Sequence, residues 1–276
     1  ELKLEPDIAK AVDGARIVVL ASPSQYMRGA LAKFKPHFKP QQHLLVNIAK
    51  GIEVDTLKRM SELCEEILGP SQYVALSGPS HAEEVSRKIP TAVVAASANP
   101  ELAKEAQQAF MNSKLRVYSS PDVCGVELGG AIKNVLAIAA GIIDGMGLGD
   151  NTKAALMTRG VAEMARLGMA LGGRRENFSG LSGLGDLIVT CTSRHSRNRH
   201  VGEDLGRGLK IDEITKSMGM VVAEGVTTAR SVRELSRRCG AETPIAAEVY
   251  AVIYEGKNPA IALDELMTRK AKDEHE

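Results

Sequence analysis

Residues 128–143, near the middle of the chain, read LGGAIKNVLAIAAGII. Apolar and small residues fill this stretch, which predicts a helix that is buried on nearly every side. Lys133 is its only charged residue. The chain changes character around this helix, because strands alternate with helices before it and only helices are expected after it. This change decides the fold that the sequence predicts.

The part of the chain before this helix alternates short β-branched runs with helical patterns. The runs predict five strands, at residues 16–20, 44–48, 73–76, 91–95 and 115–118. Between them, the spacing of apolar residues predicts a helix over 53–68 that includes Leu57, and Asn99 before Pro100 predicts the N-cap of another. Strands that alternate with helices favour a largely parallel sheet covered on both faces. We therefore expect a Rossmann-like α/β domain over residues 1–120.

Long helical patterns dominate from Pro121 onward. The clearest of them cover residues 123–143, 152–171 and 227–238. They predict an all-helical domain over residues 121–276. The glycine-rich segment 145–149 follows a helix rather than a strand, so it is predicted to connect two helices rather than to bind a dinucleotide. The predicted fold class is α/β plus all-α, a partial Rossmann-type parallel sheet followed by a helical C-terminal domain.

Composition narrows the classes of partner. The chain has 35 Lys and Arg against 34 Asp and Glu, so no global field favours nucleic acid or an anionic membrane. Four widely spaced cysteines without a C-x-x-C pair indicate reduced thiols and no metal site. No apolar run is predicted to reach the roughly 18 residues that a membrane span needs. These features predict a soluble, cytoplasmic protein.

Two candidate binding segments follow predicted strands. In an open parallel sheet, ligands bind beyond the carboxyl ends of the strands. The second predicted strand leads to Lys50, and the third leads to SGPSHA at 77–82, whose hydroxyls and free amides suit a phosphate or a hydroxyl group. Ordinary loop chemistry explains each segment equally well when it is taken alone.

The lone charge of the central helix is a candidate acid-base group. Burial lowers the pKa of an amine, so Lys133 is suited to exchange a proton with an alcohol near neutral pH. The alternative is a lysine whose stem packs while its ammonium reaches water. Asn134 offers hydrogen bonds, and Gly129 and Gly130 leave room for a ligand or a neighbouring backbone. Asp186, in GLGDL at 183–187, is placed either to orient Lys133 or to serve as a helix N-cap.

Residues 193–200 read SRHSRNRH and concentrate three arginines and two histidines. The arginine fork suits bidentate phosphate contacts. Nucleic acid is a poor match, because aromatic content is 3% and no aromatic residue interleaves with this cluster. A small phosphate ester or a dinucleotide pyrophosphate fits better.

Five motifs, taken together and in order, resemble the bacterial-type NAD(P)-dependent glycerol-3-phosphate dehydrogenases. They are KGIE at 50–53, SGPSHA at 77–82, ELGGAIKN at 127–134, GLGDL at 183–187 and SRN at 196–198. The resemblance implies a Rossmann domain and a helical domain for substrate binding and dimerisation. It implies reversible hydride transfer between NAD(P)H and dihydroxyacetone phosphate, giving sn-glycerol 3-phosphate for glycerophospholipid synthesis. It also implies NAD or NADP as cofactor, no metal, and a homodimer.

The resemblance assigns roles to individual residues. The catalytic residues that it implies are Lys133, which exchanges the proton, Lys50 and Asp186. The implied substrate-binding residues are Lys50, Gly78, Ser80, Lys133, Asp186, Ser196, Arg197 and Asn198. The implied cofactor-binding residues are Lys50, Ala82, Arg197, Val222 and Glu224. His81 departs from the aromatic residue often found in its turn, and the family's glycine-rich loop does not occur in this sequence, so we expect a further segment upstream.

Two other functions remain open from the sequence. One is a sibling two-domain dehydrogenase that acts on a hydroxy acid or an acyl thioester. The other is a non-catalytic, truncated helical scaffold. Only the first interpretation, the glycerol-3-phosphate dehydrogenase, requires a small phosphate ester at Arg197.

Overall fold

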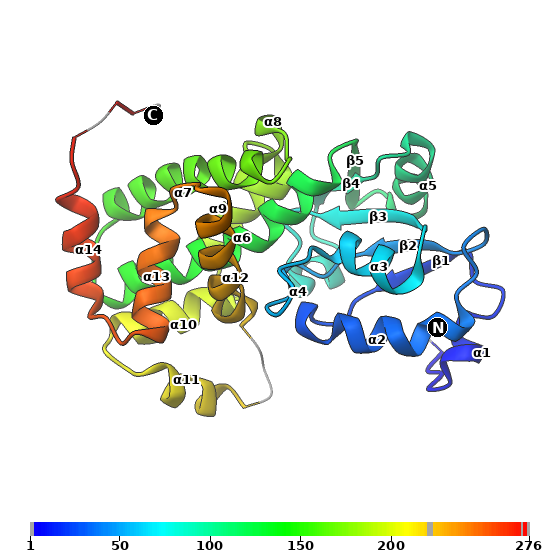
Figure 1. The fold of residues 1–276 in the computed structure, drawn as a ribbon, viewed down its shortest axis with the longest axis horizontal. Helices are drawn as coiled ribbons and strands as arrows, with labels where there is room; N and C mark the ends of the chain where they lie inside the picture. The colour runs from blue at the N-terminus through cyan, green and yellow to red at the C-terminus, as the bar shows by residue number, and fades with distance from the viewer. Residues whose placement is uncertain (1–2, 220–222, 272, 275–276) are drawn as a thin grey trace.

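The computed structural model describes residues 3–219, 223–271 and 273–274, which form a five-stranded sheet followed by a cluster of helices (Figure 1). The strands are β1 (Ile17–Leu20), β2 (Leu44–Asn47), β3 (Gln72–Ser77), β4 (Thr91–Ala96) and β5 (Leu115–Ser120). All five fall where the β-branched runs predict them. The last strand ends at Ser120, and the first long helix begins at Val123.

The sheet is mostly parallel, with strand order β1-β2-β3-β4-β5. Strands β1, β2 and β3 are parallel to one another, with Val19 paired to Val46 and Val46 to Val74. Strand β4 runs antiparallel to β3, and β5 is parallel to β4. The segment between β3 and β4 holds only the five-residue helix α4 (Ala82–Ser86), which is too short for the crossover that a parallel return needs.

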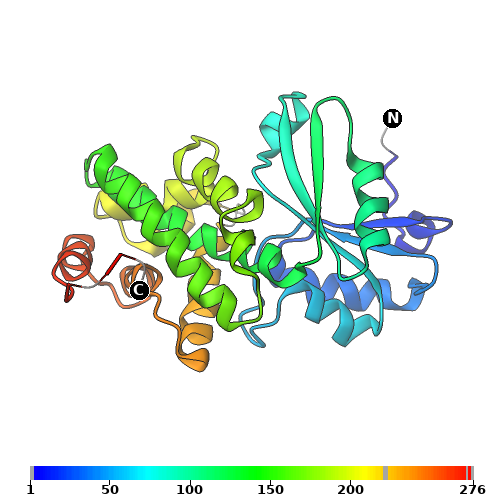
Figure 2. The same cartoon turned by 90° about the horizontal axis from the view of Figure 1, so that it is seen from above.

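Helices cover both faces of the sheet (Figure 2). On one face, α2 (Met27–Phe34) and α3 (Met60–Leu68) pack around Leu45. On the other face, α5 (Pro100–Phe110) packs on a cluster that includes Val74. As predicted, Asn99 is the N-cap of α5, because its side chain accepts a hydrogen bond from the amide of Glu101. The remaining short elements are α1 (Ile8–Val12), η1 (Ser24–Tyr26) and η2 (Lys35–His37).

The predicted helix over 53–68 is wrong in its first half, because α3 begins only at Met60. Glu53 is instead held by Arg28 of α2, whose Nε lies 2.8 Å from its carboxylate. Leu57 has a φ of 62°, which no helix interior allows. Local apolar spacing does not reveal the long-range ion pair that fixes residues 53–59 as a turn.

In the described residues after Ser120, all the regular structure is helical. They are α6 (Val123–Gly145), α7 (Asp150–Ala170), α8 (Arg175–Phe178), the π-helix η3 (Leu181–Gly185), α9 (Asp186–Thr192), α10 (Arg197–Gly206), α11 (Ile211–Met218), α12 (Glu224–Cys239), α13 (Pro244–Tyr254) and α14 (Pro259–Met267). Residues 146–149 connect α6 to α7, as the sequence predicts for the glycine-rich segment.

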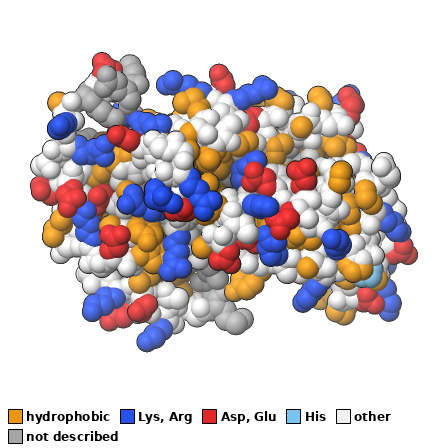
Figure 3. Space-filling view, viewed as in Figure 1, with side chains coloured by type: hydrophobic (Ala, Val, Ile, Leu, Met, Phe, Trp, Pro, Cys, Tyr) orange, Lys and Arg blue, Asp and Glu red, His pale blue; other side chains and the backbone are white. Residues whose placement is uncertain are grey.

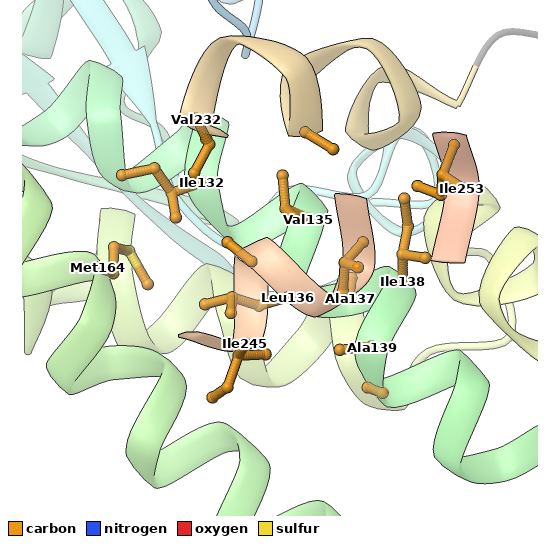
Figure 4. Packing of buried hydrophobic residues seen from close by; sticks show 14 of the residues in the cluster. Ile132, Val135, Leu136, Ala137, Ile138, Ala139, Met164, Val232, Ile245 and Ile253 are labelled. Atoms are coloured by element: carbon orange, nitrogen blue, oxygen red, sulfur yellow. The ribbon is translucent and has the colours of Figure 1, made fainter. Parts of the chain in front are cut away.

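Helix α6 is the centre of the main hydrophobic core (Figure 4). Its residues 125–143 are all buried, and Ile132, Val135 and Leu136 pack among residues of α7, α12 and α13. By length and composition, α6 is also long and apolar enough to cross a membrane, which corrects the expectation that no such run exists. Its most apolar window is, however, 100% buried inside the protein. The face of the molecule in Figure 3 mixes charges of both signs, consistent with the net charge of +1.

Candidate active site

The lone charge of the core helix lies where the sheet meets the helical region. Lys133 is 5% exposed, and its Nζ lies 3.1 Å from Oδ1 of Asp186. Asp186 is the first residue of α9 and is itself 2% exposed. Its side chain makes no N-cap bond, so the alternative role that its sequence context allows is not the one in this structure. The lysine is thus almost fully buried, and its charge is balanced inside the protein.

Lys50 joins the same carboxylate from the sheet side. It follows β2, and its Nζ donates to Oδ2 of Asp186 at 2.7 Å and to the carbonyl of Gly78 at 2.8 Å. A longer contact of 3.5 Å reaches Oγ of Ser80. The two lysines therefore share one buried carboxylate, each on its own oxygen, and three distant segments of the chain meet at this point.

Thr190 completes this cluster, and no sequence motif singled it out. Its Oγ1 accepts a hydrogen bond of 2.8 Å from Nζ of Lys133 and lies 2.6 Å from the backbone oxygen of Asp186, to which the hydroxyl donates. The two contacts fix the hydroxyl as acceptor toward the amine. The only signal in the sequence is the spacing of four residues from Asp186, which places both side chains on one face of α9.

The electrostatics of this cluster favour proton exchange at Lys133. Burial lowers the pKa of Lys133, and the charge of Lys50 lowers it further, whereas Asp186 opposes both effects. Burial acts to raise the pKa of Asp186, but the two ammonium groups outweigh it and hold that pKa below its usual value. The carboxylate therefore stays ionised while the amine of Lys133 is more easily deprotonated than an exposed lysine.

The turn after β3 forms one wall of the site. Ser80 donates to the carbonyl of Gly78 at 3.0 Å, and Ala82 begins α4. Gly130 of α6 lies directly against this wall, since a Cβ there would come within 2.9 Å of Oγ of Ser77 and 3.5 Å of Cγ of Lys50. The glycine thus lets the core helix approach the end of the sheet, as its sequence context predicts.

The start of α10 forms the opposite wall. Ser196 is the N-cap and accepts from the amide of Arg199. Asn198 donates to Oδ1 of Asn134 at 2.9 Å and accepts from the amide of Gly225 at 2.9 Å, which ties α10 to both α6 and α12. Arg197 is exposed, and among the described residues no carboxylate lies within ion-pair distance of it. Its guanidinium is therefore available to an anion in the cleft.

A cavity of about 830 Å³ runs between these walls. Lys50, Ser80, Ala82, Lys133, Ser196, Arg197, Asn198 and Glu224 line it. On the sheet side it continues along apolar residues, where Val19 and Ile48 remain 44% and 41% exposed. Eight of the predicted substrate- or cofactor-binding residues thus line one cavity, whereas Asp186 and Gly78 do not line it and instead bind the ammonium of Lys50.

Glu224 comes to this cavity from α12. Its Oε1 accepts from the amide of Ser24 at 3.3 Å, so it links the helical region to the segment after β1. Burial raises the pKa of Glu224. Val222, predicted to contact the cofactor, lies outside the described residues. In the described ranges, no cluster of three or more His, Cys, Asp or Glu side chains has the arrangement of a metal site.

Comparisons with known proteins agree with this arrangement. A family model described as NAD-dependent glycerol-3-phosphate dehydrogenase N-terminus matches residues 1–103, and one described as the C-terminus of the same enzyme matches residues 122–264. Two curated relatives are named as NAD(P)+ glycerol-3-phosphate dehydrogenases. The protein of Chlorobium phaeobacteroides is 52% identical over 99% of this chain and 82% of its own length. That of Pelotomaculum thermopropionicum is 50% identical over 100% of this chain and 79% of its own length.

A solved structure shows the same fold. The crystal structure of glycerol-3-phosphate dehydrogenase from Coxiella burnetii superimposes with a TM-score of 0.91 at 36% identity. The match covers 95% of this chain and 80% of that one. Sheet and helical region therefore have the arrangement of that enzyme.

Proposed function

The chain belongs to the NAD-dependent glycerol-3-phosphate dehydrogenase family, and we propose that the cleft between its sheet and its helices is where that chemistry takes place. The protein is an NAD(P)-dependent oxidoreductase. It reversibly converts dihydroxyacetone phosphate to sn-glycerol 3-phosphate, the precursor of glycerophospholipids. Relatives with about 50% identity over nearly the whole chain carry this name, which favours it over a sibling dehydrogenase or a non-catalytic scaffold.

The observation that carries the catalytic assignment is the buried pairing of two lysines with one carboxylate. In the reducing direction, Lys133 donates a proton to the oxygen on C2 of the substrate, and in the oxidising direction it removes the hydroxyl proton. Asp186 and Thr190 hold its amine in one orientation. The ammonium of Lys50 adds positive charge where the oxygen on C2 becomes negative.

The phosphate of the substrate fits the start of α10. Arg197 faces the cavity without a carboxylate partner among the described residues, and its planar fork suits two phosphate oxygens. Ser196 and Asn198 flank it, and Asn198 is fixed by its bonds to α6 and α12. This placement puts the phosphate and the proton donor in adjoining parts of one cavity.

The residues of the cleft also fit a nicotinamide dinucleotide. When bound, NAD(P)H supplies the hydride that reduces C2. The half-buried carboxylate of Glu224 lines the cavity and can accept hydrogen bonds from ribose hydroxyls, and the exposed side chains of Val19 and Ile48 give an apolar surface for a flat ring. Lys50 and Arg197 offer positive charge to the phosphates of the dinucleotide. Ala82, with its small side chain, leaves space beside the turn after β3. Val222 is assigned to cofactor binding by resemblance alone.

Membership of this family also bears on the domain organisation, the oligomeric state and the location of the protein. We infer that residues 1–120 act as the dinucleotide-binding domain and residues 121–276 as the substrate and dimerisation domain. The end of β5 at Ser120 and the start of α6 at Val123 support this boundary. We also infer a cytoplasmic homodimer from the family, and the complete burial of the apolar window of α6 supports the lack of membrane insertion.

A substrate panel tests the proposed function. The protein is assayed for oxidation of NADH and NADPH with dihydroxyacetone phosphate, with a 2-oxo acid and with an acyl thioester. Of the three substrates, we expect only dihydroxyacetone phosphate to be turned over. We also expect the product, sn-glycerol 3-phosphate, to inhibit the reaction. Turnover with one of the other substrates, and none with dihydroxyacetone phosphate, would identify the sibling dehydrogenase instead.

A further inference from the structure

His81 is a half-buried polar residue of the cleft that the proposed mechanism leaves without a role. It lies between β3 and α4 and lines the cavity together with Lys133 and Thr190. Its Nε2 is buried and has no hydrogen-bond partner. Across the cleft its ring faces that of His195, with 6.3 Å between the ring centroids. A buried imidazole nitrogen without a partner costs free energy, so a partner that arrives with the substrate would stabilise the complex.

The surroundings of His81 decide what its Nε2 offers. Burial lowers the pKa of His81, as does the nearby charge of Lys133, and so the ring is neutral near pH 7. The backbone carbonyl of Val189 acts in the opposite direction and raises this pKa, as a carbonyl beside a ring N–H does. A neutral imidazole has one donor and one acceptor nitrogen. Because Nε2 has no partner, this carbonyl favours the tautomer with the proton on Nδ1, in which Nε2 is the acceptor and needs a donor.

The substrate carries one hydrogen-bond donor to which the proposed mechanism assigns no acceptor. In dihydroxyacetone phosphate the C2 oxygen and the phosphate oxygens are acceptors, whereas the C1 hydroxyl donates. The two ammonium groups nearby already donate to Asp186, since Lys133 and Lys50 lie 3.1 Å and 2.7 Å from its oxygens. We therefore propose that Nε2 of His81 accepts a hydrogen bond from the C1 hydroxyl of the substrate, which makes His81 a specificity-determining residue for the hydroxymethyl group.

This inference rests on the proposed function, and a pair of substrates separates the two. Hydroxyacetone phosphate has a methyl group in place of the C1 hydroxymethyl group and keeps the ketone and the phosphate. The wild-type protein should prefer dihydroxyacetone phosphate over it in kcat/KM. His81→Phe keeps a planar ring of similar size without the acceptor. It should lower kcat/KM about 10-fold for dihydroxyacetone phosphate and leave that for hydroxyacetone phosphate within about 2-fold, the effect of one hydrogen bond.

Two further variants serve as controls for this comparison. His81→Gln restores an acceptor oxygen, so it should recover part of the preference, and it answers the question if His81→Phe does not fold. His43→Phe is the matched control, because His43 also has a buried Nε2 without a partner but lies in the sheet region beside Phe34 and Phe38. Its kcat/KM values should keep the wild-type ratio.

The outcomes are distinct. A preference lost in His81→Phe and partly regained in His81→Gln supports the assignment. An equal fall for both substrates, or an unchanged ratio, overturns it, because His81 would then act only through packing or not at all. If the wild-type protein reduces neither phosphate substrate, the proposed function itself fails.

Discussion

Helices α6 and α10 cross with their backbones in contact, and Gly202 of α10 makes that crossing possible. A Cβ atom at position 202 would lie 2.0 Å from the carbonyl oxygen of Ile138 and 2.9 Å from Cα of Gly141. Carbon and oxygen atoms pack comfortably at about 3.3 Å, so Gly202→Ala requires the two helices to separate by roughly 1 Å.

That separation would reach the site directly. Arg197 and Asn198 open the same helix, and Asn198 holds its position by bonding to Asn134 of α6. A misplacement of about 1 Å in a positioning group costs on the order of 100-fold in rate. Forcing a methyl group into packed backbone costs about 1–3 kcal/mol of stability. We therefore expect Gly202→Ala to lower kcat/KM for dihydroxyacetone phosphate between about 10- and 100-fold and to lower the free energy of unfolding.

The assay combines steady-state kinetics with chemical denaturation. Gly29→Ala is the control, because Gly29 lies in α2 with no atom within 4 Å of the added Cβ. It should raise the free energy of unfolding by up to about 1 kcal/mol and leave kcat/KM unchanged. If Gly202→Ala keeps wild-type kcat/KM, the close crossing does not set the geometry of the site, and the reasoning is wrong.

Two further predictions concern single charges. Arg197→Lys keeps the positive charge but should still raise KM for dihydroxyacetone phosphate, because an ammonium cannot bind two phosphate oxygens as the guanidinium fork does. An unchanged KM would mean that another cation binds the phosphate. Glu163 of α7 is 4% exposed and accepts from the amides of Ile245 and Ala246, and burial raises its pKa to about 7. Its neutral form is favoured by folding, so the stability it contributes is complete below about pH 4.5 and is lost as the pH rises through about 7. Relative to Glu163→Gln, the wild-type protein should therefore lose roughly 3 kcal/mol of unfolding free energy between pH 4.5 and 8, and a difference that does not vary with pH would contradict this.

Features that depend on local pattern could be predicted from the sequence. The five strands follow β-branched runs, and Lys133 stood out as one charge in an apolar helix. Leu57 was misplaced because the ion pair between Arg28 and Glu53 overrides its helical spacing. The antiparallel direction of β4 depends on the short connection after β3, which the alternation of strands and helices does not reveal.

Only part of the cluster around Lys133 could be predicted from sequence patterns. Motifs pointed to Lys50 and Asp186, because each follows a strand or a glycine-rich turn. Thr190 lies in an ordinary helical sequence, and its role depends on how α9 packs against α6. This role can be recognised only from the tertiary structure, because no sequence motif marks a threonine whose hydroxyl binds a buried amine.

The central claim is that Lys133 exchanges the proton of the reaction, and its replacement tests this most directly. Lys133→Ala and the control Lys58→Ala, whose lysine pairs with Glu66 at the surface, are compared by kcat with dihydroxyacetone phosphate after each has been shown to be folded. We expect kcat to fall on the order of 100- to 10,000-fold in Lys133→Ala and to stay at the wild-type value in Lys58→Ala. A kcat near the wild-type value in pure, folded Lys133→Ala would contradict the account.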